Sequence, residues 1–413
     1  MISICFLICI FLNKKMEINA KIKKLPKHLS IDELNKLSKE DLIAKIQSLE
    51  AHNMQLQNII SKSNNGTMKQ VHKNIDYAKY MFRHIFIKLF YFGWDCQGFA
   101  TQEDTINTIE YYLFDALTKT CLIKDRSSSN YHRCGRTDKG VSSFGQTISI
   151  DVRSNLPNPD DSSTEIDYCK VLNRVLPDFI KCIAWAPVPS DFSSRFNCTS
   201  RTYRYYFPKG NLDINRMREA SKFFIGSHDF RNFCKMDVGN GVVQFVRNII
   251  DFKIDLLNES KEVNEYTMYV AIIKGLKKEE PSIIQELLNI KANPRKPDYQ
   301  MANEVPLNLF ECDYENVKWN YSQENLTVVS ENLRKMWTFM SIKKAMVEDA
   351  MCSISTQLKY PKLICKCLTE NLLTGVKPKK YVPVLKRQKC ESLEDKIHHY
   401  SKRNRIEIIS KNK

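Results

Sequence analysis

The chain has 413 residues, which is too many for one small core and enough for two subdomains with tails. Charged residues make up 27% of the sequence and apolar residues 43%, as is typical of a soluble globular protein. The formal net charge of +16 reflects either solubility or a polyanionic partner, most simply nucleic acid.

The cysteine spacing argues against both a disulfide framework and a zinc site. Fourteen cysteines are present, yet none forms a C-x-x-C pair. The closest spacings are Cys365-Lys366-Cys367 and His132-Arg133-Cys134. The sequence therefore predicts a reduced cytoplasmic or nuclear protein with free thiols and no metal.

The amino-terminal residues 1–15 are interpreted as a leader that is not native to the protein. The apolar run from Ile2 to Leu12 is too short to span a bilayer and lacks the basic start and small-residue cleavage site of a secretory signal. Met16 follows directly and is the expected start of translation. No membrane association is predicted.

Residues 30–62 are predicted to be helical. Near the start of the segment a serine is twice followed by an acidic residue three positions later, as at helix N-termini, and apolar residues then recur at alternating steps of four and three. In this heptad pattern Asn53 occupies an a position, as in dimeric coiled coils that use one asparagine to fix their register. The segment either forms a homodimer or docks on its own domain, and the sequence leaves both open. Residues 63–77 are polar and read as a linker.

The folded part is predicted to begin near Ala78, with a first subdomain over residues 78–190. The segment from Phe82 to Phe92 is rich in β-branched and aromatic residues and predicts a strand. A helix is expected from Asn107 onward, and a further strand ends near Val152. Together they form a β-α-β unit.

A second unit over residues 191–350 is predicted to repeat this plan. Its expected elements are a strand over 200–207, a helix over 215–224, a strand within 243–256 and another over 266–273. The predicted fold class is α+β, with two ferredoxin-like units forming a largely antiparallel sheet around a central basic cleft. Residues 351–413 form a basic tail that is either mobile or a phosphate-contacting arm.

One aspartate stands in a basic, glycine-bounded segment between the predicted elements. Asp138 has Arg133, Arg136 and Lys139 as sequence neighbours, and Gly135 and Gly140 flank the turn. Opposite charges lower a carboxyl pKa, so these cations are expected to keep the aspartate ionised, as suits a nucleophile or an electrostatic stabiliser. The glycines are expected to admit a large ligand. A structural ion pair in a turn is the alternative.

A second cluster interleaves cations with aromatic rings in the stretch FSSRFNCTSRTYRYYF. Arg195 and Arg201 alternate with Phe196 and Tyr203. Arginine contacts phosphate and aromatic rings stack on unpaired bases, although a strand with one wet face gives the same alternation. The two clusters together predict chemistry on a base of a folded RNA.

These residues carry a resemblance to a known family. The stretch CGRTDKGVSSFGQTISIDVRS, which starts at Cys134, resembles the catalytic motif of the TruA-type tRNA pseudouridine synthases, and FSSRF with RTYRYYF resembles their second motif. Further stretches resemble the eukaryotic synthase-3 branch, among them GWDCQGFATQEDTINTIE and NPRKPDYQMANEVPLNLFECDYENVKW. The resemblance covers most of the chain from about Leu37 onward.

The resemblance implies that the protein converts uridine to pseudouridine in the anticodon stem-loop of tRNA, at positions thirty-eight and thirty-nine, with no cofactor and no metal. Asp138 matches the catalytic aspartate that attacks the flipped uridine. Arg136 matches the arginine that assists base flipping, and Tyr203 the tyrosine that packs against the base. Arg195, Arg201 and Lys139 are also predicted to bind the substrate, because the basic clusters around them suit phosphate contacts.

The chain departs from the family pattern after Gly275. The family continues there with a helix whose arginine pairs with the catalytic aspartate, whereas this sequence passes directly to LKKEEPSIIQELLN. Arg247 stands in a similar motif but too early to take over that role. The departure raises two hypotheses, a coding segment lost from the sequence or a catalytically inactive tRNA-binding protein.

Overall fold

We analysed a computed structural model of the chain. It describes residues 75–156, 165–210, 212–234, 244–257, 267–272, 283–299, 302–355 and 382–404, together with residues 357 and 372. The predicted leader, the helical segment over 30–62, most of the linker, and the departure after Gly275 lie outside these ranges.

The first half of the sheet contains four strands and two helices. Its elements are β1 (Met81–Tyr91), α5 (Ile109–Lys119), β2 (His132–Arg133), β3 (Ser142–Ser154), α6 (Tyr168–Asn173) and β4 (Ile180–Pro187). The predicted strands over 82–92 and 141–152 are confirmed to within two residues. The predicted helix start is also confirmed, because the Thr108 side chain caps α5 by accepting from the Tyr111 amide.

The second half repeats the same order of elements with one insertion. It contains β5 (Cys198–Pro208), α7 (Ile214–Lys222), β8 (Ile254–Leu256), β9 (Met268–Ala271), α8 (Ile283–Leu288) and β10 (Leu307–Tyr314). A separate two-stranded sheet, β6 (Gly226–Asp229) with β7 (Val246–Ile249), is inserted between α7 and β8. The α+β class is therefore confirmed.

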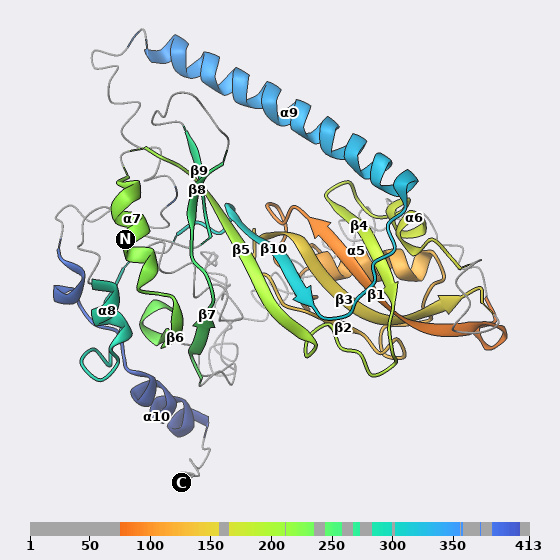
Figure 1. Cartoon of the computed structure of the whole chain (residues 1–413), viewed down its shortest axis with the longest axis horizontal. Helices are drawn as coiled ribbons and strands as arrows, with labels where there is room; N and C mark the ends of the chain where they lie inside the picture. The colour runs from red at the N-terminus through yellow and green to blue at the C-terminus, as the bar shows by residue number, and fades with distance from the viewer. Residues whose placement is uncertain are drawn as a thin grey trace, which may run out of the picture. The chain divides into compact units, whose positions relative to one another are not determined.

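Both halves share one eight-stranded sheet of order β4-β1-β3-β10-β5-β9-β8, with β2 paired to β3 (Figure 1). Within each half the strands follow the ferredoxin-like arrangement, in which the fourth strand lies beside the first. The halves join where β10 pairs with β3 in parallel, at Asn308 with Ser142 and Leu309 with Ser143. All other strand pairs are antiparallel, as predicted.

The core of the first half lies between the sheet and its two helices. Apolar residues at alternate positions of β1, such as Ile85, Ile87 and Leu89, are fully buried against α5 and α6. On the opposite face of β1, the Phe86 ring packs on Trp319 and Tyr314, with ring centroids 4.7 Å away in both cases. Both faces of β1 are thus covered, which explains its nearly continuous apolar sequence.

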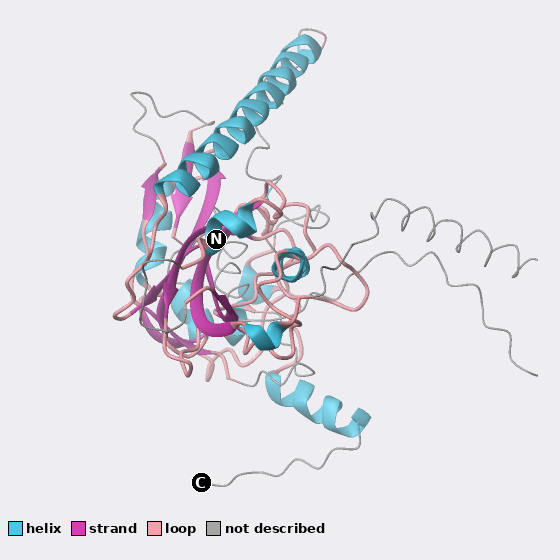
Figure 2. Ribbon diagram, turned by 90° about the vertical axis from the view of Figure 1, so that its right-hand side faces the viewer, coloured by secondary structure: helices cyan, strands magenta, loops and turns pink. Residues whose placement is uncertain are grey.

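Two further helices, α9 (Gln323–Ser355) and α10 (Leu393–Asn404), follow the sheet in sequence. Both views show α9 as one unbroken helix (Figures 1 and 2). Its first turns dock on the first half, where Asn325 is buried and accepts a hydrogen bond from Asn173 at 2.8 Å. Among the described residues, no helix combines the length and the apolar character that crossing a membrane requires.

Two glycines allow close backbone approaches, one at the end of the loop between β2 and β3 and one between β3 and β10. A Cβ atom at Gly93 would lie 2.0 Å from the Val141 carbonyl oxygen, and one at Gly145 would lie 2.5 Å from the Phe310 carbonyl oxygen. Neither backbone oxygen can rotate away as a side chain would. Glycine is therefore required at both positions.

Gly93→Ala is expected to lower the free energy of unfolding by about 2 kcal/mol or more, because the added methyl group displaces backbone. Gly135→Ala is the matched control, since a Cβ atom there meets no atom within 4 Å. The control should change stability by less than about 0.5 kcal/mol. Urea unfolding of both variants checks this, and equal effects would contradict the close approach at Gly93.

Candidate active site

The loop that carries Asp138 is held by the segment that follows β1. The Phe99 amide donates to the Thr137 carbonyl at 3.0 Å, and the Gly140 amide donates to the Cys96 carbonyl at 3.1 Å. The Thr137 hydroxyl also bonds to the buried Tyr91 hydroxyl, 2.7 Å away. Three contacts thus fix the backbone on both sides of the aspartate.

Asp138 itself begins a tight turn. Its carbonyl accepts from the Val141 amide at 3.2 Å, and Gly140 has a φ of +76°. A positive φ at the third residue of a four-residue turn is the signature of a type II turn and explains the glycine there. A Cβ atom at Gly140 would also lie 2.9 Å from the Glu304 side chain. The turn conformation and the nearby Glu304 side chain therefore explain the glycine at position 140. The predicted role of Gly140 in admitting a ligand stays a prediction.

Asp138 is half-buried, and its pKa is raised to about 7. Burial is the main cause, and the nearby Glu304 carboxylate adds to it. Asp138 forms no ion pair with any other residue in the described ranges. The prediction that the three basic sequence neighbours keep Asp138 ionised is therefore wrong, because none of them faces its carboxyl group.

One of these neighbours, Arg133, is engaged elsewhere. It forms an ion pair with the fully buried Glu110 at the start of α5, which also accepts from Tyr131 at 2.9 Å and from Arg126 at 3.1 Å. Burial alone would raise the pKa of Glu110, but the two arginines and the Thr101 amide outweigh it, so the pKa is lowered. Glu110 was not predicted as a site residue, because its arginine partners stand 16 and 23 residues further along the chain.

The other two neighbours point into solvent. The side chains of Arg136 and Lys139 are exposed. The pKa of Arg136 is lowered by partial burial and by the positive charges of Arg133 and Arg195. Arg136 and Arg195, which belong to separate sequence motifs, are thus near each other in the fold.

The loop that carries Arg195 is anchored to the first half of the sheet. The Ser193 hydroxyl bonds to the His132 ring at 2.6 Å, and the Ser194 amide donates to the Ser149 hydroxyl at 3.2 Å. Arg195 is exposed, and its guanidinium lies 5.4 Å from the centroid of the Phe196 ring. That ring is 77% exposed, which leaves its outer face available for stacking.

Arg201 and Tyr203 lie on one face of β5, next to the start of the Asp138 loop. The Arg201 guanidinium donates through Nε to the Cys134 sulfur and through Nη2 to the Cys134 carbonyl, both at 3.2 Å. Tyr203 is half-buried and packs against Cys134, Leu309 and Cys312. Burial raises the pKa of the Tyr203 hydroxyl, which is therefore protonated at neutral pH. Both predicted substrate-binding residues thus adjoin the loop, and Arg201 is engaged within the protein.

Asp138→Asn is expected to stabilise the protein at about pH 8. The pKa of Asp138 is 3.8 in the unfolded chain and about 7 in the folded protein. The unfolded state therefore loses this proton first, and the free energy of unfolding falls as the pH rises from 3.8 to about 7. Each pKa unit corresponds to roughly 1.4 kcal/mol, so the gain should reach ~2–4 kcal/mol at about pH 8 and fall below ~1 kcal/mol near pH 4.

Urea unfolding at both pH values, with Asp191→Asn as an exposed control, measures this difference. Destabilisation by Asp138→Asn at the higher pH would show that a cation faces the carboxylate.

Comparison with known proteins identifies the family of the chain. A family model described as tRNA pseudouridine synthase matches residues 220–315. The tRNA pseudouridine(38/39) synthase of Homo sapiens is 39% identical over 420 aligned positions, which cover 89% of this chain and 86% of the relative. A synthase of the same name from Saccharomyces cerevisiae is 35% identical over 318 positions, which cover 68% of this chain and 72% of the relative.

The tRNA pseudouridine(38/39) synthase of Bos taurus is 38% identical, and the alignment covers 91% of this chain and 90% of the relative. Its 434 positions exceed the 413 residues of the chain, so the relative contains residues with no counterpart here. Similarity of this extent along most of both chains decides the family. The chain belongs to the TruA-type tRNA pseudouridine synthase family, in the branch of the 38/39 synthases.

Proposed function

We propose that this protein isomerises uridine to pseudouridine in the anticodon stem-loop of tRNA, at positions 38 and 39. The observation that carries the proposal is the similarity, over 86–90% of their length, to two mammalian synthases named for these positions. The exposed arginines around Asp138 support a tRNA substrate. The enzyme is an isomerase, and the reaction consumes no cofactor.

Asp138 is the proposed nucleophile. The isomerisation breaks the bond from the ribose to uracil N1, forms a bond to C5, and moves one proton from C5 to N1. Only the ionised carboxylate carries the electron pair that such an attack requires. With its pKa near 7, a substantial fraction of Asp138 is ionised at neutral pH, and the deprotonated carboxylate is a better nucleophile than one with an ordinary pKa.

The arginines beside Asp138 are proposed to receive the tRNA backbone and to form the wall of a basic cleft. Arg136 and Arg195 are exposed, and the positive charge of Arg195 contributes to the lowered pKa of Arg136, so the two guanidinium groups are near enough to repel each other. A phosphate group between them removes that repulsion and gains charge-assisted hydrogen bonds. Lys139, exposed on the same turn as Asp138, is suited to a further phosphate contact.

Base flipping gives the remaining residues their proposed roles. A uridine must leave the stack before a side chain reaches its ribose, at a cost of a few kcal/mol that is smaller near a loop than within a duplex. Arg136 is proposed to fill the vacated stack, and Tyr203 to pack against the flipped base beside Cys134. Arg201 holds the start of the Asp138 loop through its two contacts to Cys134, which is a positioning role in addition to the predicted contact with substrate.

A catalytically inactive tRNA-binding protein is the alternative. It would follow if the helix that supplies the arginine partner of the aspartate in the family were absent from the mature protein. The Bos taurus synthase contains residues that have no counterpart here, as a lost coding segment would leave. The free thiols favour a reducing location, the cytoplasm or the nucleus, and a homodimer through residues 30–62 remains a separate proposal.

Asp138→Asn is expected to lower the single-turnover rate of pseudouridine formation by on the order of 10⁴-fold, while tRNA affinity changes less than about threefold, because phosphate contacts dominate affinity. Release of tritium from C5-labelled uridine and filter binding measure the two quantities. The matched control is Asp115→Asn, which removes a half-exposed carboxylate that pairs with Lys119 on α5 and should leave both unchanged. Turnover near wild type in Asp138→Asn would exclude the nucleophile.

The rate of the wild-type enzyme should rise about tenfold per pH unit below the pKa of Asp138 and level off above about pH 7, because the ionised fraction rises in that way. Single-turnover rates between about pH 5 and 8 test this. A flat profile with full activity at the lowest pH would mean that the working carboxylate has a cation beside it.

A further inference from the structure

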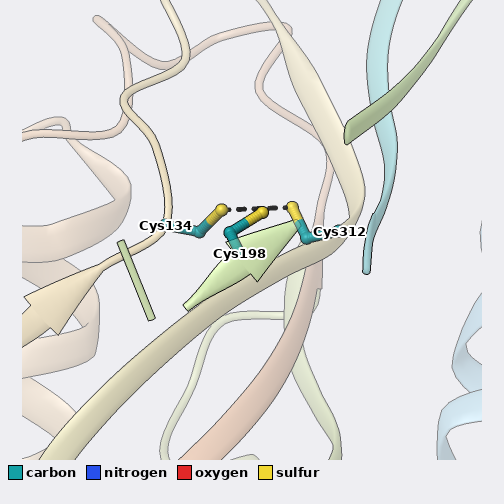
Figure 3. Close-up of side chains that lie close together, drawn as sticks. All are labelled: Cys134, Cys198 and Cys312. Carbon is teal, nitrogen blue, oxygen red and sulfur yellow. Dashed lines mark hydrogen bonds between the residues drawn. The ribbon is translucent and has the colours of Figure 1, made fainter. Parts of the chain in front are cut away.

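Three cysteines from distant parts of the sequence meet at the seam between the two halves of the sheet. Cys134 follows β2, Cys198 begins β5 and Cys312 lies within β10. Their sulfur atoms all lie within 4.8 Å of one another, and those of Cys134 and Cys312 are 3.4 Å apart. Figure 3 shows the three side chains pointing toward a common centre.

This spacing fits a shared metal ion. Zinc binds thiolates at about 2.3 Å with tetrahedral angles, which places sulfur ligands about 3.8 Å apart. The Cys134–Cys312 separation of 3.4 Å is close to that value, and all three sulfur atoms lie within 4.8 Å of one another, so the cluster is of the size that a shared ion requires. The backbone beneath the thiols is held on regular strands, since Arg201 of β5 pairs with Cys312 and Ser200 pairs with Asp313 of β10.

The surroundings of the thiols are suited to anionic sulfur. Arg201 directs its Nε–H at the Cys134 sulfur and its Nη2–H at the Cys134 carbonyl. A zinc ion with three thiolates carries a net charge of minus one, which this guanidinium neutralises. N–H groups that donate to metal-bound sulfur are a usual second layer around such ions. The partly buried Tyr203 and Tyr314 side chains pack against the cluster.

A second pair of thiols in the same chain lacks these features. Cys169 of α6 and Cys182 of β4 lie in the apolar core of the first half, where burial raises the pKa of both. No third thiol joins them among the described residues that could hold a metal ion, and they behave as small apolar side chains. The core pair is therefore an internal comparison for the three-thiol cluster.

We propose that Cys134, Cys198 and Cys312 bind one thiophilic divalent cation, most simply Zn²⁺, with solvent as the fourth ligand. Binding deprotonates the thiols that are still protonated and releases those protons, so affinity should rise with pH. The Cys198 thiol gives up its hydrogen bond to the Ser200 carbonyl in this step.

The proposed ion would join the three segments that carry the candidate active site. Cys134 begins the loop of Arg136 and Asp138, Cys198 follows the loop of Arg195, and Cys312 belongs to the strand at the seam. An ion bound by all three cysteines would link the two halves of the sheet next to the loops proposed to bind the substrate. The role is structural, and the proposal does not depend on Asp138 being a nucleophile. The absence of C-x-x-C spacing could not reveal such a site, because its ligands come from three separate segments.

The test measures metal in the full-length protein, purified under reducing conditions and without metal-affinity resin. Plasma mass spectrometry should find about one Zn²⁺ per wild-type chain. Cys198→Ser and Cys312→Ser should lose the ion or raise its apparent Kd at least tenfold, and Arg201→Met should raise it about 10-fold to 100-fold. Cys182→Ser, in the core pair, should retain the ion.

Cobalt provides a readout that is independent of activity and of folding yield. Protein stripped of metal and titrated with Co²⁺ should develop the charge-transfer absorption of cobalt-thiolate bonds, and Cys198→Ser should weaken it. Far-UV circular dichroism identifies any variant that has unfolded. Cys198 is half-exposed at the start of a strand, so its substitution is expected to disturb folding least of the three. The proposal is overturned if wild type binds neither ion, if Cys134 and Cys312 form a disulfide instead, or if folded Cys198→Ser binds Zn²⁺ as wild type does.

Discussion

The close approach of the segment after β1 to the loop between β2 and β3 is the constraint on which the candidate site depends. At Gly93 the two backbones touch so closely that a Cβ atom has no room, and hydrogen bonds from Phe99 and Gly140 hold the same loop on either side of Asp138. The aspartate is thus presented by a backbone that cannot relax. Such rigidity is what a reacting group needs, because misplacement by about 1 Å can cost about 100-fold in rate.

The same rigidity has an electrostatic consequence. The loop holds Asp138 half-buried beside Glu304, with no cation among the described residues to offset the burial. The cations of the motif are instead distributed outward, with Arg133 bound to Glu110 and with Arg136 and Arg195 facing solvent. The proposed function therefore divides two tasks: the half-buried carboxyl group would react, while the exposed arginines would attract the polyanion. Because its pKa is raised in the folded protein, Asp138 lowers the stability of the protein at neutral pH, as is common for groups held at functional sites.

Several parts of this arrangement were predictable from the sequence. Alternation and β-branched residues located β1, β3, β5 and β9, and the lone aspartate in its glycine-bounded segment identified the candidate site. The predicted electrostatics of Asp138 were wrong, because residues close in sequence were assumed to be close in space. Arg133 is five residues from Asp138 yet pairs with Glu110, which is 23 residues away, and Glu304, the group that does act on Asp138, is remote in sequence. The three-thiol cluster escaped prediction for the same reason, because strand pairing assembled it.

The ionisation of Asp138 in the free protein is the central claim. Carbon-13 NMR of protein labelled at aspartate carboxyl groups, with the Asp138 signal assigned by its absence from Asp138→Asn, titrates this group directly. The account predicts a titration midpoint near pH 7, set by burial and Glu304. A midpoint at or below the ordinary value of 3.8 would contradict it, and would require a cation beside the carboxylate that the described residues do not supply.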